Sequence, residues 1–129
     1  MEFLNAFSHM DWSQVLHLTL QHISLVGIAV ILAILIGVPL GVLSGYAGGR
    51  TEALIMRIAD IQLSFPAILL ALILLAFLKP GLGNIVIALV AVQWAYYART
   101  TRSAAIVERR KEYIEAARGL GLSPARIIF

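Results

Sequence analysis

The sequence predicts an all-α membrane protein, on three observations: its apolar composition, its long uncharged windows and the placement of its basic residues. Hydrophobic residues make up 60% of the 129-residue chain and charged residues 13%, whereas soluble domains carry about 25% charged residues. A chain of this length has too small an interior to hide so much apolar surface from water. The lipid bilayer is therefore its expected environment.

Three uncharged windows approach the length of about 20 apolar residues that a membrane-crossing helix requires. We predict transmembrane helices at residues 23–46, 61–78 and 82–98. The first window also carries glycines, which allow a second helix to approach closely, and a proline, which is tolerated where neighbouring helices cover the freed carbonyl. These residues are Gly27, Gly37, Pro39, Gly41 and Gly45.

The second and third windows contain polar features that a simple lipid anchor would not need. Residues 64–66, Ser-Phe-Pro, stand near the start of the second window. Gln93 lies deep in the third window and is predicted to face protein or a transport pathway rather than lipid. Arg57 and Asp60, three residues apart just before the second window, are predicted to form a structural ion pair.

The basic residues set the predicted orientation. Nine of the ten lysine and arginine residues lie between the first two windows or after the third, and Lys79 alone lies in the other loop. Because cytoplasmic loops carry the excess of basic residues, we expect a multi-pass protein with its N-terminus outside. Residues 1–21 are too polar to span and are predicted to lie along the outer lipid surface.

Several function classes are excluded by what the sequence lacks. The chain has no cysteine, which rules out a thiolate nucleophile and a cysteine-ligated zinc site. His17 and His22 are five residues apart, a poor spacing for two ligands on one helix face, so no metal site is expected. No nucleophile or carboxylate is paired with a histidine near a span, so we expect no catalytic residues and no enzyme. The basic loops explain the positive charge, and no nucleic-acid partner is expected.

The polar tail after Arg102 has the pattern of a helix, a break and a second helix. A cytoplasmic helix is predicted over residues 103–122, ended by glycines that favour the left-handed conformation. Ser123 and Pro124 then predict the N-cap and first residue of a further helix at 124–129. The first helix carries an apolar and small-residue strip suited to a groove of a soluble partner. The strip comprises Ile106, Tyr113, Ile114, Ala117 and Leu120.

Residues 115–121 read Glu-Ala-Ala-Arg-Gly-Leu-Gly, which resembles the Glu-Ala-Ala-x-x-x-Gly signature of the permease subunits of ATP-binding-cassette importers. Residues 45–129 resemble dipeptide, oligopeptide and nickel permeases of this class. Residues 18–43 look more like the start of glycine betaine and choline permeases. The signature continues in the family with Ile-x-Leu-Pro, which would lie beyond Phe129, so we expect a sequence truncated after the coupling helix. The matching points are Gly48-Gly49, Arg57 with Asp60, Phe65-Pro66, Asn84, Tyr97 with Arg99, and Glu112-Tyr113.

The resemblance implies the type I importer permease fold and a division of labour among several proteins. Two permease subunits, identical or different, would form the pathway in a bacterial or archaeal inner membrane. An extracytoplasmic binding protein would deliver a peptide or related small solute, and a cytoplasmic ATPase would drive transport. ATP is then used by the partner, since this chain has no Gly-x-x-x-x-Gly-Lys-Ser/Thr loop and is expected to bind no cofactor.

The resemblance also implies which residues dock on the ATPase. They are Tyr113, Glu115, Ala116, Ala117, Gly119 and Gly121. Two alternatives stay open: a permease of the glycine betaine and choline type, and a truncated membrane protein that does not transport and acts only as a partner-binding scaffold.

Overall fold

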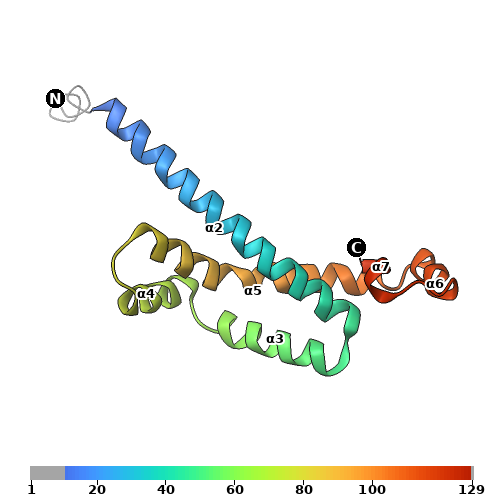
Figure 1. Cartoon of the computed structure of the whole chain (residues 1–129). Helices are drawn as coiled ribbons and strands as arrows, with labels where there is room; N and C mark the ends of the chain where they lie inside the picture. The colour runs from blue at the N-terminus through green and yellow to red at the C-terminus, as the bar shows by residue number, and fades with distance from the viewer. Residues whose placement is uncertain (1–10, 129) are drawn as a thin grey trace, which may run out of the picture.

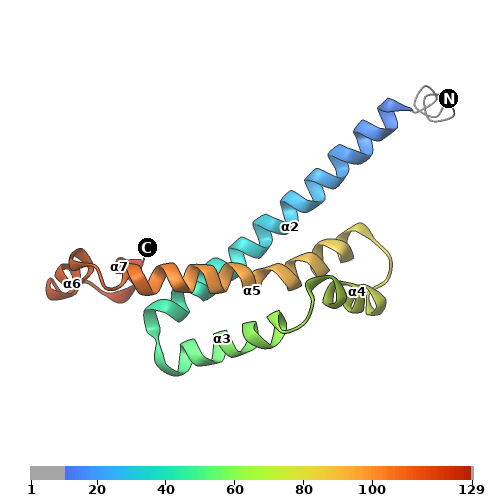
Figure 2. The same cartoon turned by 180° about the vertical axis from the view of Figure 1, so that it is seen from behind.

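The computed structural model describes residues 11–128, and every element in this range is a helix. In chain order these are α2 (Trp12–Ala47), α3 (Gly49–Leu63), α4 (Ala67–Phe77), α5 (Leu82–Glu108), α6 (Glu112–Gly119) and α7 (Pro124–Ile128). In Figure 1, α2 crosses α5, and α6 and α7 gather at the C-terminal end of α5. Figure 2 shows the same arrangement from behind, with α3 beside α5. The all-α prediction is confirmed.

Helix α2 is longer than the first predicted span. The carboxylate of Asp11 accepts hydrogen bonds from the backbone N–H groups of Ser13, at 3.1 Å, and Gln14, at 3.4 Å, which satisfies free donors at the helix start. The helix then runs through Pro39 to Ala47 without a break. Residues 12–21 are therefore not a separate segment as predicted, because no helix-breaking residue divides them from the apolar window. Residues 1–10 lie outside the described residues.

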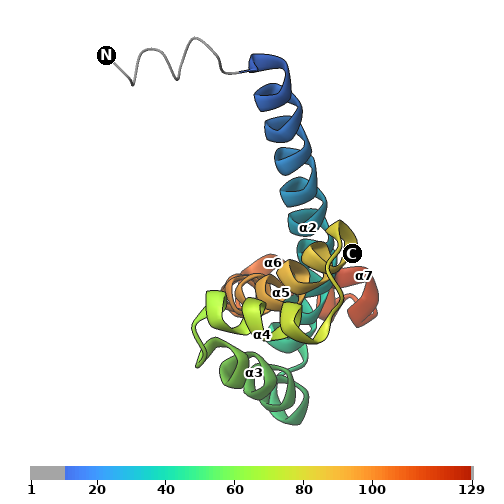
Figure 3. The same cartoon turned by 90° about the vertical axis from the view of Figure 1, so that its left-hand side faces the viewer.

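Membrane-crossing capacity differs among the helices. Within residues 11–128, α2 is the one helix that is long and apolar enough to cross a bilayer by itself, and its N-terminal half extends away from the other helices (Figure 3). Helices α3 and α4 meet at 89° and together count as a second crossing only if they form one broken span. Helix α5 contains the third predicted window, but Asn84, Gln93 and Arg99 make it too polar to count as a crossing by itself. The three-span topology stays a prediction.

Small residues join α2 and α5 at close range. The buried residues of α2 include Ala29, Ala33, Gly37, Gly41 and Gly45, a four-residue repeat that follows one face of the helix. The buried face of α5 is mostly alanine and comprises Ala88, Val92, Ala95 and Ala98. A Cβ atom at Gly37 would lie 2.4 Å from the carbonyl oxygen of Trp94. The predicted close approach of a second helix is thus confirmed at Gly37, Gly41 and Gly45, whereas Gly27 has nothing within 4 Å.

The second predicted span is divided in the structure. Helix α3 ends at Leu63 and α4 begins at Ala67, immediately after Pro66. Proline has no N–H and disfavours helical geometry in the residue before it. The Ser64 hydroxyl donates to the Asp60 carbonyl oxygen at 2.7 Å at the end of α3. The sequence Ser-Phe-Pro therefore ends one helix and starts another, and the predicted helix over residues 61–78 is wrong in this respect.

Three polar contacts hold α3 against α5. Glu52 pairs with Arg102, Asp60 pairs with Arg99, and Gln62 bonds to α5 near Trp94. The predicted ion pair of Arg57 with Asp60 is therefore corrected, because Asp60 faces α5 and takes the guanidinium of Arg99 instead. The Arg57 side chain is exposed. Local spacing favoured a partner three residues away, and helix packing supplied one 39 residues away.

The tail also differs from the single helix predicted over residues 103–122. Helix α5 ends at Glu108, Lys111 takes an extended conformation, and α6 begins at Glu112. The turn is held by Arg109, whose guanidinium donates to the Tyr46 carbonyl oxygen at 2.8 Å, at the C-terminal end of α2. This contact uses a free carbonyl at a helix end. The predicted start of the next helix at Pro124 is confirmed.

Candidate partner-docking site

Helix α6 has the charge pattern and the ending of a stable short helix. Glu112 and Glu115 stand in its first turn and Arg118 in its last, which complements the helix dipole. Gly121 has a φ of +76°, as predicted from its position. The N–H of Leu122 donates to the Ala117 carbonyl oxygen at 3.2 Å, and the N–H of Gly121 donates to the Arg118 carbonyl oxygen at 2.9 Å. This is the Schellman ending, in which glycine is favoured because its φ is positive.

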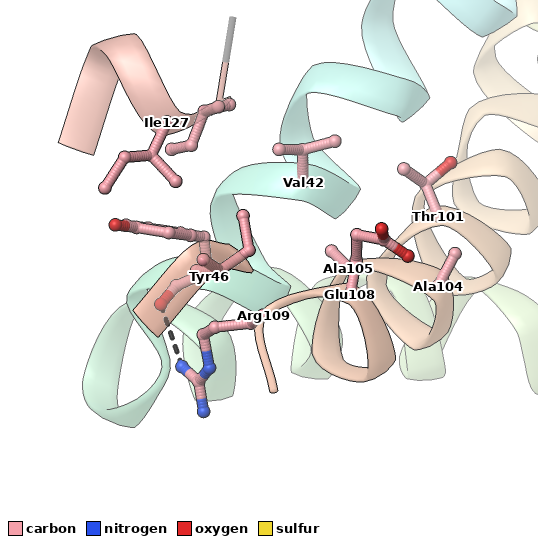
Figure 4. Close-up of a pocket in the computed structure, with 10 residues that line it drawn as sticks. Val42, Tyr46, Thr101, Ala104, Ala105, Glu108, Arg109 and Ile127 are labelled. Carbon is pink, nitrogen blue, oxygen red and sulfur yellow. Dashed lines mark hydrogen bonds between the residues drawn. The ribbon is translucent and has the colours of Figure 1, made fainter. Parts of the chain in front are cut away.

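The inner face of α6 is packed on the ends of α2 and α5. Ile114 is 8% exposed and borders an apolar cavity of about 280 Å³, shown in Figure 4. Residues of α7 border the cavity on its other side. Its lining residues are Val42, Tyr46, Thr101, Ala104, Ala105, Glu108, Arg109, Ile114, Ile127 and Ile128.

Arg118 shares the inner face with Ile114, since residues four apart lie on one side of a helix. Its guanidinium carbon lies 5.2 Å from the centre of the Tyr46 ring, within the range of a cation–π contact. Figure 4 shows Tyr46 beside Ile127, with the hydrogen bond from Arg109 to the Tyr46 backbone. The turn before α6 and the last turn of α6 are thus both held at the same residue of α2.

The outer face of α6 is exposed. Glu115, Ala116 and Gly119 are exposed, and the Leu120 side chain just after the helix is 81% exposed. The face therefore combines one carboxylate, two small residues and one apolar side chain. Such a surface permits a close approach by another backbone, because small side chains do not hold the two backbones apart.

The predicted apolar strip is divided between two helices and two faces. Ile106 belongs to α5, Ile114 is buried inside the chain, and Ala117 is half-buried. Only Tyr113 and Leu120 are exposed. A single docking strip requires one continuous helix, and the break after Glu108 removes that condition.

Tyr113 takes part in a polar cluster at the start of α6. The Glu108 carboxylate accepts hydrogen bonds from the Lys111 ammonium, at 2.9 Å, and from the Tyr113 hydroxyl. The bond from Lys111, and then that from Tyr113, hold the pKa of the Glu108 carboxyl below its ordinary value. The same bonds raise the pKa of Lys111 and of Tyr113. The cluster bridges the turn between α5 and α6.

A second polar feature, missed by the sequence reasoning, lies at the bend between α3 and α4. The Gln62 side chain accepts from the Trp94 indole N–H at 2.9 Å and donates to the Val92 carbonyl oxygen at 2.9 Å. Gln93, the predicted pathway residue, is half-buried beside this contact in the chain. Gln62 could have been found by the same signal, a glutamine inside an uncharged window.

The described residues offer no evident centre for metal chemistry. Within residues 11–128 there is no group of three or more histidine, cysteine, aspartate or glutamate side chains arranged to hold an ion. What the arrangement does offer is a short helix with a packed inner face and a free outer face. It can serve as a contact surface for another protein.

Comparison with known proteins gives one family and a consistent set of relatives. A family model described as binding-protein-dependent transport system inner membrane component matches residues 37–129. A di/tripeptide transport system permease of Pseudomonas aeruginosa is 40% identical over 81% of this chain and 35% of its own length. A probable D,D-dipeptide transport system permease of Escherichia coli is 42% identical over 84% of this chain and 37% of its own length. An oligopeptide transport system permease of Bacillus subtilis is 39% identical over 78% of this chain and 33% of its own length.

The chain spans about a third of the length of these relatives. The match to the second relative covers 109 residues, which exceeds the 85 residues from Gly45 to Phe129 (129 − 45 + 1). Similarity to peptide permeases therefore extends into residues 18–43, for which the sequence predicted a glycine betaine and choline type.

Proposed function

The chain belongs to the family of binding-protein-dependent transport system inner membrane components, and on this premise we propose that it forms part of the translocation pathway of an ATP-driven importer. In this proposal the chain is a multi-pass membrane subunit with its N-terminus outside. It pairs with a second permease subunit and receives solute from an extracytoplasmic binding protein. It uses no cofactor of its own, because ATP is hydrolysed by a separate cytoplasmic ATPase.

The free outer face of α6 is the observation that carries the proposal. Glu115, Ala116 and Gly119 are exposed on a helix whose inner face is already occupied. A helix presented in this way fits the groove mode of recognition between proteins. Glu115 can pair with a basic group of the ATPase, and the two small residues allow the surfaces to meet closely. Gly121 ends α6 sharply, so the following chain does not obstruct the face.

Peptides are the solute class that the relatives favour. The three relatives carry names for di/tripeptide, D,D-dipeptide and oligopeptide transport. We therefore propose a peptide or related small solute as cargo, ahead of glycine betaine or choline. Gln93 and Gln62 are the polar residues that we propose for the pathway wall, since Gln62 bonds to Val92 and Trp94, the residues on either side of Gln93 in the chain.

Co-purification with the ATPase subunit of a peptide importer tests the docking surface. Ala116→Arg should weaken binding at least about tenfold, because bulk and an unpaired charge in a close contact cost more than about 1.4 kcal/mol. Ala53→Arg is the matched control, since it makes the same change at an exposed alanine of α3. Glu115→Gln and Glu115→Arg should weaken binding in that order. Equal binding by the Ala116→Arg and Ala53→Arg variants would exclude α6 as the docking surface.

The transport role is separated from a scaffold role by a second measurement. A chain that only binds a partner retains the ATPase on co-purification but does not change its activity. A permease subunit should change the rate of ATP hydrolysis when solute-loaded binding protein is added to the complete assembly in vesicles. An unchanged rate in an assembly that contains all subunits would favour the scaffold.

A further inference from the structure

The contacts of Tyr46 lead to a residue role that the family match does not assign. Tyr46 is the next-to-last residue of α2, yet its contacts are with the segment after α5. Its backbone carbonyl accepts from Arg109, in the turn before α6, at 2.8 Å. Its ring lies under Arg118, in the last turn of α6, at 5.2 Å. One residue of α2 therefore contacts the turn that precedes α6 and the last turn of α6.

A second attachment point matters because the covalent connection alone leaves α6 free to swivel. Residues 109–111 form a short turn between α5 and α6, and a helix fixed at one end can pivot about that end. The cavity of about 280 Å³ behind Ile114 leaves room for such a movement toward α2 and α5 (Figure 4). The contact of Arg118 with the Tyr46 ring opposes it at the far end of the helix.

The end of α2 is itself fixed on α5, so a force on Tyr46 acts on both helices. A Cβ atom at Gly45 would lie 2.7 Å from the Ala105 Cβ and 2.7 Å from the Arg102 carbonyl oxygen. At Gly41 it would lie 2.4 Å from the carbonyl oxygen of Ala98. Helices in such close contact shift together more readily than they separate.

We infer that Tyr46 is the positioning residue that transmits displacement of α6 to the α2–α5 pair. The inference rests on the proposed function, in which a docked ATPase moves α6. In this arrangement α6 is attached to α5 through the connecting turn and to α2 through Tyr46. Its orientation is set by the Tyr46 ring and carbonyl, and movement of the outer face is passed through Arg118 and Tyr46 into α2.

The absence of cysteine makes a direct distance measurement practical. Spin labels at Leu43→Cys on α2 and Leu122→Cys after α6 occupy exposed positions that are not part of the proposed docking face. Pulsed electron paramagnetic resonance then gives the distribution of distances between α2 and α6. The parent protein should give one narrow distribution, and Tyr46→Leu should broaden it because the ring under Arg118 is lost. Tyr46→Phe keeps the ring and the carbonyl and should keep the narrow distribution.

Substitutions at Arg118 test the same contact from the exposed side, where loss of folding is not expected. Arg118→Gln should broaden the distance distribution as Tyr46→Leu does. Arg118→Lys should keep the narrow distribution of the parent, since an ammonium also binds an aromatic face. A purely structural effect of Tyr46→Leu would not produce this difference between the two variants at Arg118. Narrow distributions in both Tyr46→Leu and Arg118→Gln would overturn the inference.

Repeating the measurement with the ATPase separates this inference from the proposed function. The parent distance distribution should shift when the ATPase binds. Tyr46→Leu should still bind the ATPase, because the outer face is unchanged, but should lose the coupled shift. If the parent protein binds no ATPase, the proposed docking fails while the broadening in the free protein still decides the role of Tyr46. If the ATPase binds and Tyr46→Leu shifts like the parent, the transmission role of Tyr46 is refuted.

Discussion

Replacement of Gly41 by alanine should destabilise the protein, although alanine is the better helix former. A Cβ atom at this position would lie 2.4 Å from the carbonyl oxygen of Ala98 and 2.8 Å from the Thr101 Cβ. Ordinary contact begins at 3.4 Å, so α2 and α5 would have to separate by 1.0 Å, the difference between 3.4 and 2.4 Å. The nearest obstacle is backbone, which cannot rotate away as a flexible side chain can.

The expected magnitude follows from a comparison within the same helix. Gly27→Ala makes the same chemical change where nothing lies within 4 Å. Both variants gain the helix preference of alanine over glycine, about 1 kcal/mol, so this gain cancels in the difference between them. What remains is the cost of overpacking, about 1–3 kcal/mol, together with the dispersion attraction that weakens along the helix pair as the two helices move apart.

Unfolding by a denaturing detergent, followed by far-ultraviolet circular dichroism in a mild detergent, measures the two free energies. Gly27→Ala should be as stable as the parent or more stable, and Gly41→Ala should be less stable than Gly27→Ala by about 1–3 kcal/mol. Equal free energies of unfolding in the two variants would show that α2 and α5 do not touch at Gly41. The assignment of a small-residue interface between these helices would then be incorrect.

Two further outcomes test the polar contacts. Gln62→Met should leave the Trp94 indole N–H without its acceptor, which costs about 1–3 kcal/mol when the group is buried. The expected result is a shift of Trp94 fluorescence to shorter wavelength, recorded in a Trp12→Phe variant so that Trp94 is the one remaining tryptophan. An unchanged spectrum would contradict the prediction. Stability should fall as the pH drops below 4.5, the ordinary pKa of the Glu108 carboxyl. The pKa of this carboxyl is lowered in the folded protein, so its ionised form stabilises the fold above the unfolded-state pKa. That stabilisation is lost as the pH falls through the folded-state pKa. Glu108→Gln should weaken this pH dependence in an unfolding titration, and an unaltered profile would mean that the cluster with Lys111 does not form.

Several features were predictable because they depend on neighbours in sequence. Gly121 was expected to end a helix, and it has the positive φ that this ending requires. Pro124 was expected to begin the next helix, and it does. The glycines of the first window were expected to admit a second helix, and Gly37, Gly41 and Gly45 lie against α5. Each inference used a backbone property of one residue, which the surrounding fold changes little.

Other features escaped prediction because they depend on partners far away in sequence. Spacing suggested Arg57 as the partner of Asp60, whereas the fold supplies Arg99. The charged tail suggested one helix, whereas the bond from Arg109 to Tyr46 draws the chain into a turn after Glu108. Gln62 was overlooked because its hydrogen-bond partner, the Trp94 indole N–H, is 32 residues later in the chain.

The sequence by itself determined that this protein is helical and apolar, that helices begin at Leu82 and Pro124, and that residues 115–121 resemble the permease signature. The tertiary structure decided which face of that signature is free. It buried Ile114, exposed Glu115 and Ala116, and set Arg118 over Tyr46. The reason is physical: backbone preference acts within a few residues, whereas the choice of partner for each side chain is made only when distant helices pack together.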